Sequence, residues 1–252
     1  MKITYEQIKN NPTARALVEK ADEAMFNIGY TEHSLAHVVH VADVAQYILL
    51  QLGHSEREAE LARIAAYLHD IGNIVNRTGH AQSGAVMAYQ FLSGLGADVE
   101  DVADIVTAIG NHDEGSASPV TPIAAALIIA DKTDVRRSRV RNVDPASFDI
   151  HDRVNYSVQE SVTQIDTEHA EVLLRLRRRR GRFRGGRLLA EFDDRLRRRH
   201  VQLHLAVNGV LDLVDDGAVR LLHFRRERAD TVRRRRDFVY HRGIRRGLRH
   251  SP

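Results

Sequence analysis

The sequence predicts a mainly α-helical protein, with a helical bundle over residues 1–149, a small α+β appendage over residues 150–220 and a basic tail over residues 221–252. Three observations predict this architecture. Apolar residues recur three and four positions apart as far as about Asp134, which is the period of a helix. Further along the chain apolar and polar residues alternate, which favours strands. Arginine then replaces lysine altogether, which separates the two ends of the chain in composition.

The predicted helices of the bundle carry apolar stripes with recognisable ends. Glycine after a stripe indicates a helix end, because it readily adopts the left-handed conformation found there. Pro122 opens the last stripe in a first helical turn, where its missing N–H is not needed. The stripes lie at residues 38–52, followed by Gly53; at 61–68, followed by His69; at 84–92, followed by Gly94 and Gly96; at 99–109; and at 123–130.

The pattern changes after a loop around residues 142–149. Residues 162–176 alternate well enough to predict a β-hairpin, and residues 201–207 predict a further strand. The stretch between them, residues 177–200, is consistent with an exposed helix. We expect a small α+β appendage here, followed by a poorly ordered tail over residues 221–252.

The two ends of the chain differ in charge. Residues 1–174 contain 13 Lys and Arg against 25 Asp and Glu, whereas residues 175–252 contain 24 Arg, no Lys and nine Asp and Glu. An arginine-rich segment could bind nucleic acid or an acidic surface. No aromatic residues are interleaved at stacking spacing, so we do not expect nucleic-acid binding. Such runs are also what GC-rich DNA encodes out of frame, and segments 177–199 and 221–252 leave that alternative open.

Composition also limits where the protein works and what chemistry it can use. The apolar run at residues 123–130 is far shorter than the roughly 20 residues that span a bilayer. The first residues lack the apolar segment of a secretory signal, so we expect a cytoplasmic protein without a membrane partner. The chain has no cysteine, so any metal ion must be held by nitrogen and oxygen ligands.

Histidine and aspartate recur at the ends of the predicted helices. His69 and Asp70 are adjacent, and neighbouring side chains point about 100° apart within a helix. At a helix end, both can turn toward a point beyond the terminus. An ion on the bundle axis could then take ligands from several helices, as metal sites in helical bundles do. The candidate ligands are His37, His69, Asp70, His80, His112 and Asp131.

The segments around these residues resemble the HD superfamily of metal-dependent phosphohydrolases over roughly residues 30–140. The resemblance is greatest to its two-metal members, which include diadenosine-tetraphosphate hydrolases. It implies an HD-type helical bundle for this part of the chain. The matching segments are HVVHVADVA, AAYLHDIGN, HAQSGAVMA, AIGNHDEG and LIIADKTDVRRSR, in the order and with the spacing of the family.

The resemblance implies a role for each candidate. The first metal ion would be held by His37, His69, Asp70 and Asp131, and Asp70 would bridge to a second ion held by His80 and His112. Asp70 and Lys132 would be the catalytic residues. The chain departs from many relatives in having Asn73 where they have a lysine, which removes a cation that could meet phosphate. The other cations that could bind the substrate phosphate are Arg77, Lys132, Arg136 and Arg137.

The implied reaction is hydrolysis of a phosphate ester or anhydride by a metal-bound hydroxide. The substrate would be a small phosphorylated metabolite or nucleotide. A site made of imidazoles and carboxylates suits a divalent transition metal, with Fe or Mn favoured over Co, Ni or Mg, and two ions are expected. The sequence is also consistent with a homodimer.

Several alternatives are consistent with the same residues. His33 and His40 flank His37, and the uncertain register leaves His33 as an alternative first ligand. His80 could merely begin a helix, and His112 could lie in a solvated loop. Similar ligand sets in the superfamily belong to di-iron oxygenases, or the domain could be a catalytically silent nucleotide sensor. A nucleic-acid-binding protein that uses the arginine tail is a further alternative.

Overall fold

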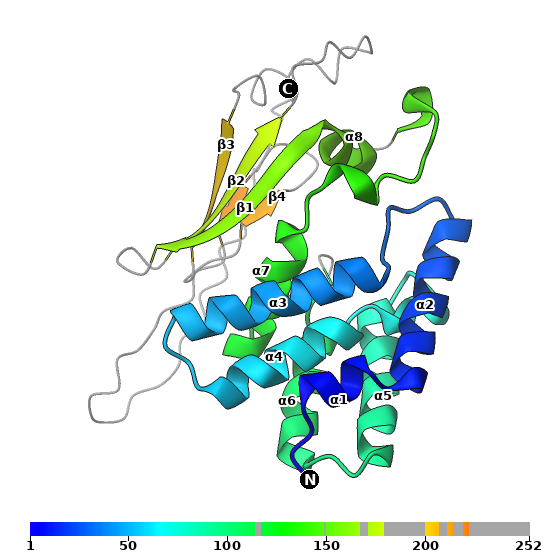
Figure 1. The fold of residues 1–252 in the computed structure, drawn as a ribbon, viewed down its shortest axis with the longest axis vertical. Helices are drawn as coiled ribbons and strands as arrows, with labels where there is room; N and C mark the ends of the chain where they lie inside the picture. Colours follow the sequence, from blue (N-terminus) through cyan, green and yellow to red (C-terminus); the bar gives the residue numbers. More distant parts are fainter. Residues whose placement is uncertain are drawn as a thin grey trace, which may run out of the picture.

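The computed structural model describes residues 1–113, 117–148, 150–166, 171–178, 200–206, 211–213 and 219–221. Helices dominate the N-terminal two thirds of the chain, as the sequence predicts, and antiparallel strands follow (Figure 1). The helices are α1 Tyr5–Lys9, α2 Pro12–Asn27, α3 Leu35–Gln51, α4 Glu56–Leu68, α5 His80–Gly94, α6 Val99–Gly110, α7 Pro122–Thr133 and α8 Ile150–Ser157, with short 3-10 helices η1 Ile71–Ile74, η2 Arg137–Arg139 and η3 Pro145–Ser147.

The ends of the helices follow from local side-chain chemistry. Ser55 accepts a hydrogen bond from the backbone N–H of Glu58 while the Glu58 carboxylate accepts one from the backbone N–H of Ser55, which begins α4 with a capping box. Thr121 caps α7, whose first residue is Pro122 as expected. After α3 the chain turns at Gly53, with a φ of 78°, which is the left-handed conformation expected of this glycine.

The core lies between α3, α4 and α7, with α5 and α6 packed beside them. Alanines on α4 are fully buried, and their small size lets the neighbouring helices approach closely. Larger apolar side chains such as Ile64 and Leu68 fill the remaining space. Burial of a large apolar side chain contributes roughly 1.5–3 kcal/mol, so this core is the main source of stability.

Two glycines let η1 lie directly against α5. A Cβ atom built on Gly72 would lie 2.0 Å from the carbonyl oxygen of His80 and 2.5 Å from the backbone nitrogen of Gly84. A Cβ atom built on Gly84 would lie 3.2 Å from the carbonyl oxygen of His69. No larger residue fits at position 72 without displacing the backbone. These glycines therefore bring the start of α5 next to the end of α4.

The strands form two antiparallel groups. The first has the order β1 Val158–Asp166, β2 Glu171–Arg178 and β3 His200–Ala206, and the second pairs β4 Leu211–Leu213 with β5 Val219–Leu221. The first confirms the predicted hairpin, and β3 confirms the predicted strand.

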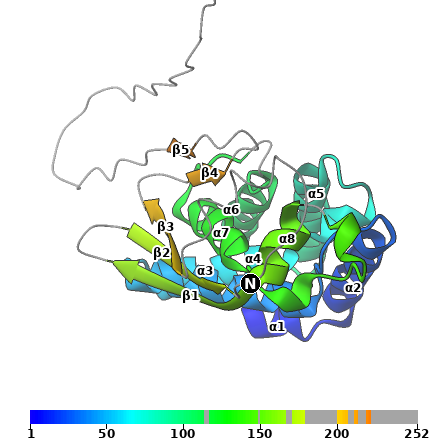
Figure 2. The same cartoon turned by 90° about the horizontal axis from the view of Figure 1, so that it is seen from above.

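The sheet lies beside α3 in both views of the ribbon (Figures 1 and 2). Val172 of β2 joins the core cluster of the helices, whereas Val158 and Leu174 form a smaller buried cluster with Val135.

Some predictions fall outside the described residues. Of the exposed helix expected at residues 177–200, the described ends lie in β2 and β3 instead, and residues 179–199 fall outside the described residues. The order of nearly all of the tail at 221–252 also falls outside them, and the domain boundaries after 149 and 220 stay predictions. Among the described helices, none has the length and apolar character needed to cross a membrane.

Candidate metal centre

The first group of side chains gathers where three helices end or begin. His37 lies in the first turn of α3, His69 caps the C-terminus of α4, and Asp131 lies in the last turn of α7. Nε2 of His37 lies 3.3 Å from Oδ1 of Asp131 and 3.6 Å from Oδ2 of Asp70. Nε2 of His69 lies 3.0 Å from Oδ2 of Asp70 and 3.7 Å from Oδ1 of Asp131. The two nitrogens therefore face the same pair of carboxylate oxygens.

The second group lies where α5 begins and α6 ends. His80 is the first residue of α5, and His112 follows α6 by two positions. Both side chains are buried, which argues against the alternative of an exposed histidine at a helix start or in a solvated loop. Their Nε2 atoms lie 3.2 Å apart, and Nε2 of His80 lies 3.6 Å from Oδ1 of Asp70. The structure thus brings together two histidines that are 32 positions apart in the chain.

Asp70 belongs to both groups. Its Oδ2 atom faces His37 and His69, whereas its Oδ1 atom faces His80. Asn73 donates hydrogen bonds to Oδ1 and to the backbone oxygen of Asp70, which fixes the carboxylate in this orientation. A carboxylate that offers one oxygen to each of two ligand groups can bridge two ions. Among the described residues, two groups could hold a metal ion. The first consists of His37, His69 and Asp70, and the second consists of Asp70, His80 and His112.

Hydrogen bonds at Nδ1 orient every one of these imidazoles. Nδ1 of His69 donates to the carbonyl oxygen of Ala66, and Nδ1 of His112 donates to that of Ile109. Nδ1 of His80 donates likewise to Arg77. A carbonyl oxygen only accepts, so Nδ1 carries a proton, and in the neutral ring Nε2 directs its lone pair toward the centre. Metal-ligating histidines are usually oriented in this way.

The Nε2 atoms of the first group lack hydrogen-bond partners among the described residues. Nε2 of His37 and Nε2 of His69 are buried and, among the described residues, have no hydrogen-bond partner. The lone pairs of His80 and His112 face each other across 3.2 Å, an unfavourable contact without a cation between them. Buried polar atoms are rarely left unsatisfied. Imidazole nitrogens and carboxylate oxygens arranged in this way fit a divalent transition metal.

The electrostatics of the centre attract positive charge. Burial would lower the pKa of His69, but the Asp70 and Asp131 carboxylates outweigh it and raise that pKa to about 9. Burial lowers the pKa of His112 to about 4, assisted by the charge on His69. Burial would raise the pKa of Asp70, yet His69 holds it well below its usual range. The carboxylates therefore stay charged and favour a cation.

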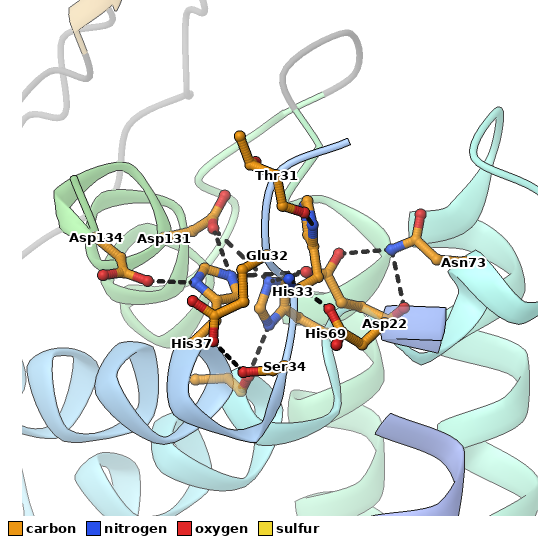
Figure 3. A network of polar contacts seen from close by, with 12 residues as sticks. Asp22, Thr31, Glu32, His33, Ser34, His37, His69, Asn73, Asp131 and Asp134 are labelled. Carbon is orange, nitrogen blue, oxygen red and sulfur yellow. Dashed lines mark hydrogen bonds and ion pairs between the residues drawn. The ribbon is translucent and has the colours of Figure 1, made fainter. Parts of the chain in front are cut away.

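Asp134 is the residue that sequence reasoning missed. It is buried, and its Oδ2 accepts a hydrogen bond from Nδ1 of His37 at 2.7 Å (Figure 3). Nε of Arg136 donates to its Oδ1 atom at 2.8 Å. Burial would raise the pKa of Asp134, but the hydrogen bond from His37 and the charges of Arg139 and Arg136 hold it well below its usual range. Asp134 thus orients His37 as a carboxylate partner.

Asp131 is less enclosed than its apolar helix suggests. Its side chain is 18% exposed, and Nζ of Lys132 lies 3.2 Å from its Oδ2 atom. It lies in the last turn of α7, which ends at Thr133.

The structure favours His37 over His33 as the first ligand. His33 is buried beside His37, with ring centroids 5.6 Å apart, but His37 has its Nε2 atom in the first group. His33 donates instead to the carbonyl oxygen of Thr31 (Figure 3).

The cations expected to meet phosphate have different surroundings. Nη1 of Arg77 lies 3.3 Å from Nε2 of His80, and Lys132 borders Asp131. Arg136 is paired with Asp134 and Glu32, and the guanidinium of Arg137 stacks 3.8 Å from the ring centroid of Tyr156. The structure thus gives Arg136 and Arg137 other partners, while Arg77 and Lys132 border the two ligand groups.

Comparison with known families matches the part of the chain that contains the two groups to one domain family. Residues 34–136 match the HD domain family. The matched range begins at the N-cap of α3 and extends beyond α7, so it contains every candidate ligand. HD domains bind divalent metal ions, and the two buried groups of this chain could hold them.

Individual relatives are more distant. The chain is 25% identical over 173 residues to an uncharacterized protein of Methanocaldococcus jannaschii, which covers 60% of this chain and 66% of that protein. It is 27% identical over 126 residues to ribonuclease Y of Fervidobacterium nodosum and 27% identical over 128 residues to ribonuclease Y of Aster yellows witches'-broom phytoplasma, covering about half of this chain and 22% of each relative. The matches therefore span at most two thirds of these relatives.

One solved structure is also similar. It is the crystal structure of a predicted HD superfamily hydrolase from an uncultured Thermotogales bacterium, with 28% sequence identity and a TM-score of 0.39. The match covers 52% of this chain and 73% of that one.

Proposed function

We propose that the protein is a metal-dependent phosphohydrolase that cleaves a phosphate ester or anhydride of a small metabolite or nucleotide. The observation that carries this proposal is the position of Asp70, which offers one oxygen to His37 and His69 and the other to His80. Two ions held by these residues would activate water, polarise a phosphoryl oxygen and stabilise the leaving oxygen. The match of residues 34–136 to the HD domain family supports this reaction class.

The residues of the chain divide this work. His37, His69 and Asp131 complete the first group around Asp70, and His80 and His112 complete the second. Their donor atoms favour Fe or Mn, with Co, Ni or Mg as weaker candidates. The fixed imidazoles and the hydrogen bond from Asn73 to Asp70 keep the donor atoms in place before an ion binds.

Lys132 lies at the border of the first group, where its ammonium can face a phosphoryl oxygen of the substrate. Arg77 occupies the equivalent place at the second group. A phosphate bound between them would meet a cation on each side, which neutralises charge that develops during displacement.

The ribonuclease Y relatives bear on the choice of substrate. Their name indicates cleavage of RNA, and this chain matches 22% of their length. RNA therefore belongs among the substrates to be tested, although the proposal is a small phosphorylated molecule.

The proposal is tested with protein purified without chelator. Elemental analysis gives its metal content, and phosphate release is then measured anaerobically with Mn(II) or Fe(II) against phosphate monoesters, nucleoside polyphosphates, dinucleoside polyphosphates and an RNA oligonucleotide. We expect anaerobic turnover of a small substrate, which an Asp70→Asn control abolishes. Turnover that requires O₂ would overturn the proposal in favour of a di-iron oxygenase, and metal binding without any turnover would favour a nucleotide-sensing domain.

A further inference from the structure

Arg77 contacts the second ligand group in an unusual way. It lies between η1 and α5, and its half-buried side chain reaches back over the site. Its Nη1 atom lies 3.3 Å from Nε2 of His80 and 3.3 Å from Oδ1 of Asn73. Its guanidinium carbon lies 5.4 Å from the ring centroid of Tyr30. Three groups from different segments therefore hold one cation beside the second group.

The contact with His80 involves the lone pair that an ion needs. The backbone oxygen of Arg77 accepts a hydrogen bond from Nδ1 of His80 at 3.0 Å, so the ring proton is on Nδ1. The other ring nitrogen of His80 can then only accept, and the guanidinium of Arg77 is its donor. A guanidinium cannot be deprotonated in a protein, so its N–H and a metal ion compete for the same lone pair.

Displacement from His80 would not release Arg77 from the site. The amide oxygen of Asn73 and the ring of Tyr30 still attract the guanidinium. The N–H group that left Nε2 of His80 then lacks an acceptor at the edge of the second group. An oxygen of a phosphoryl group beside the ion is the acceptor that this geometry favours, because guanidinium forms short, charge-assisted hydrogen bonds to phosphate.

We propose that Arg77 exchanges between two partners: it occupies the Nε2 atom of His80 when no ion is bound there, and it binds a phosphoryl oxygen of the substrate when the second ion is in place. Arg77 is then the residue that selects a phosphorylated ligand for the ion-loaded site. The inference rests on the proposed function, and it assigns the phosphate contact to a cation four residues along the chain from Asn73. Asn73 and Tyr30 act as positioning residues for it.

The exchange predicts effects of opposite sign for one substitution. Arg77→Met removes a positive charge beside the second ion and a competitor for its ligand, so the affinity for the second equivalent of Mn(II) should rise by about tenfold. The same substitution removes a charge-assisted hydrogen bond to phosphate, so the affinity of the Mn(II)-loaded protein for inorganic phosphate should fall by about tenfold or more. A merely structural arginine would lower both affinities together.

The experiment uses the full chain and does not depend on turnover. Mn(II) binding is followed by electron paramagnetic resonance of the free ion, and binding of inorganic phosphate to the loaded protein is followed by calorimetry. Arg15→Met is the matched control, because Arg15 is half exposed on α2 and pairs only with Glu19 among its ionic contacts in the described part of the chain. Tyr30→Leu should weaken phosphate binding by a few fold and leave Mn(II) binding unchanged.

Each outcome decides the inference. A rise in Mn(II) affinity with a fall in phosphate affinity for Arg77→Met supports it. A fall in both, an unchanged phosphate affinity, or uptake of one ion by both the wild type and Arg77→Met overturns it. If Arg77→Met raises the Mn(II) affinity and lowers the phosphate affinity but the wild-type protein hydrolyses no ester, the proposed hydrolase is contradicted and the assignment of Arg77 still stands.

Discussion

The two ligand groups share the Asp70 carboxylate but differ in the charged side chains around it. The first group has a second carboxylate, Asp131, and a third, Asp134, that orients His37 from behind. The second group adds two histidines to Asp70, backs them with carbonyl oxygens, and has the cation Arg77 against one of them. Since carboxylates attract a divalent ion and a guanidinium repels it, the first group should bind its ion more tightly.

The pKa shifts of the histidines show the same difference between the two groups. Burial opposes a charge on every ring, yet the Asp70 and Asp131 carboxylates raise the pKa of His69 to about 9. Burial lowers the pKa of His80, although it faces Asp70 as well, and the charge of Arg77 adds to that lowering. Nε2 of His69 lies 3.0 Å and 3.7 Å from the carboxylates of Asp70 and Asp131, whereas Nε2 of His80 lies 3.6 Å and 3.9 Å from those of Asp70 and Asp113 and has Arg77 beside it. We therefore expect the first group to bind an ion more tightly than the second.

The largest effect is expected where the two groups meet. Asp70→Ala should remove both ions and lower activity by at least about a thousandfold, because among the described residues Asp70 alone belongs to both groups. The helices should remain, since Asp70 follows α4 and takes no part in the apolar core. Elemental analysis, phosphate release and circular dichroism measure the three quantities.

Asp104→Ala is the matched control for this substitution, because Asp104 is an exposed carboxylate on α6. It should change neither metal content nor activity. An Asp70→Ala protein that keeps full activity would show that the site lies elsewhere.

A second substitution separates the groups. His80→Ala or His112→Ala should halve the metal content, since the first group keeps all of its ligands. Activity should fall by orders of magnitude because one ion cannot act on both the attacking and the leaving oxygen. The double variant should be little worse than either single one, as expected of residues that act as a unit.

Metal content and single-turnover phosphate release check this prediction. An unchanged metal content in both single variants would mean that neither histidine is needed to hold an ion.

A substitution of Asp134 tests the first group separately from the second. Asp134→Ala should weaken binding of the first ion by about 10–100-fold, because His37 loses the carboxylate that orients its ring. Asp134→Asn should lose less, since an amide oxygen can still accept the hydrogen bond from Nδ1 of His37.

Competition with a chelator measures the two affinities. The second ion should bind with nearly unchanged affinity in both variants, and equal losses from the two groups would instead indicate a general loosening of the fold. An Asn variant no better than Ala would contradict a role for the hydrogen bond.

The outcome for Asp134 shows what the sequence could and could not predict. The helices, the hairpin and the positions of His69 and Asp70 at a helix end follow from local periodicity and capping. The contact between Asp134 and His37 joins residues 97 positions apart. It depends on how the backbone turns after α7, and no sequence pattern at that point predicts this turn.

The carbonyl partners of the imidazoles are equally hidden, because any residue can supply a carbonyl oxygen. Arg77 was among the predicted cations, but its contact with Tyr30 depends on how η1 packs on α2. The packing of Gly72 against α5 decides where His80 lies, and only the assembled bundle shows it.

The smallest effect on metal binding is expected at the cation of the first group. Lys132 contacts the Oδ2 atom of Asp131, whereas His37 and His69 face the Oδ1 atom. Lys132 therefore does not compete for a ligand atom in the way that Arg77 does, and Lys132→Met should change the affinity for the first ion by less than about threefold.

Activity should respond more than binding does. If the ammonium faces a phosphoryl oxygen in the transition state, Lys132→Met lowers kcat by about tenfold or more and Lys132→Arg restores part of it, because the charge matters more than its geometry at a side chain that is 32% exposed. Steady-state kinetics with saturating Mn(II), alongside a chelator titration, separates the two quantities. An unchanged kcat would remove Lys132 from the catalytic residues, and a large loss of the first ion would show that it serves to hold Asp131 in place. A tenfold loss of kcat with the ion retained would instead give each ligand group its own phosphate-facing cation, one that competes with the ion and one that does not.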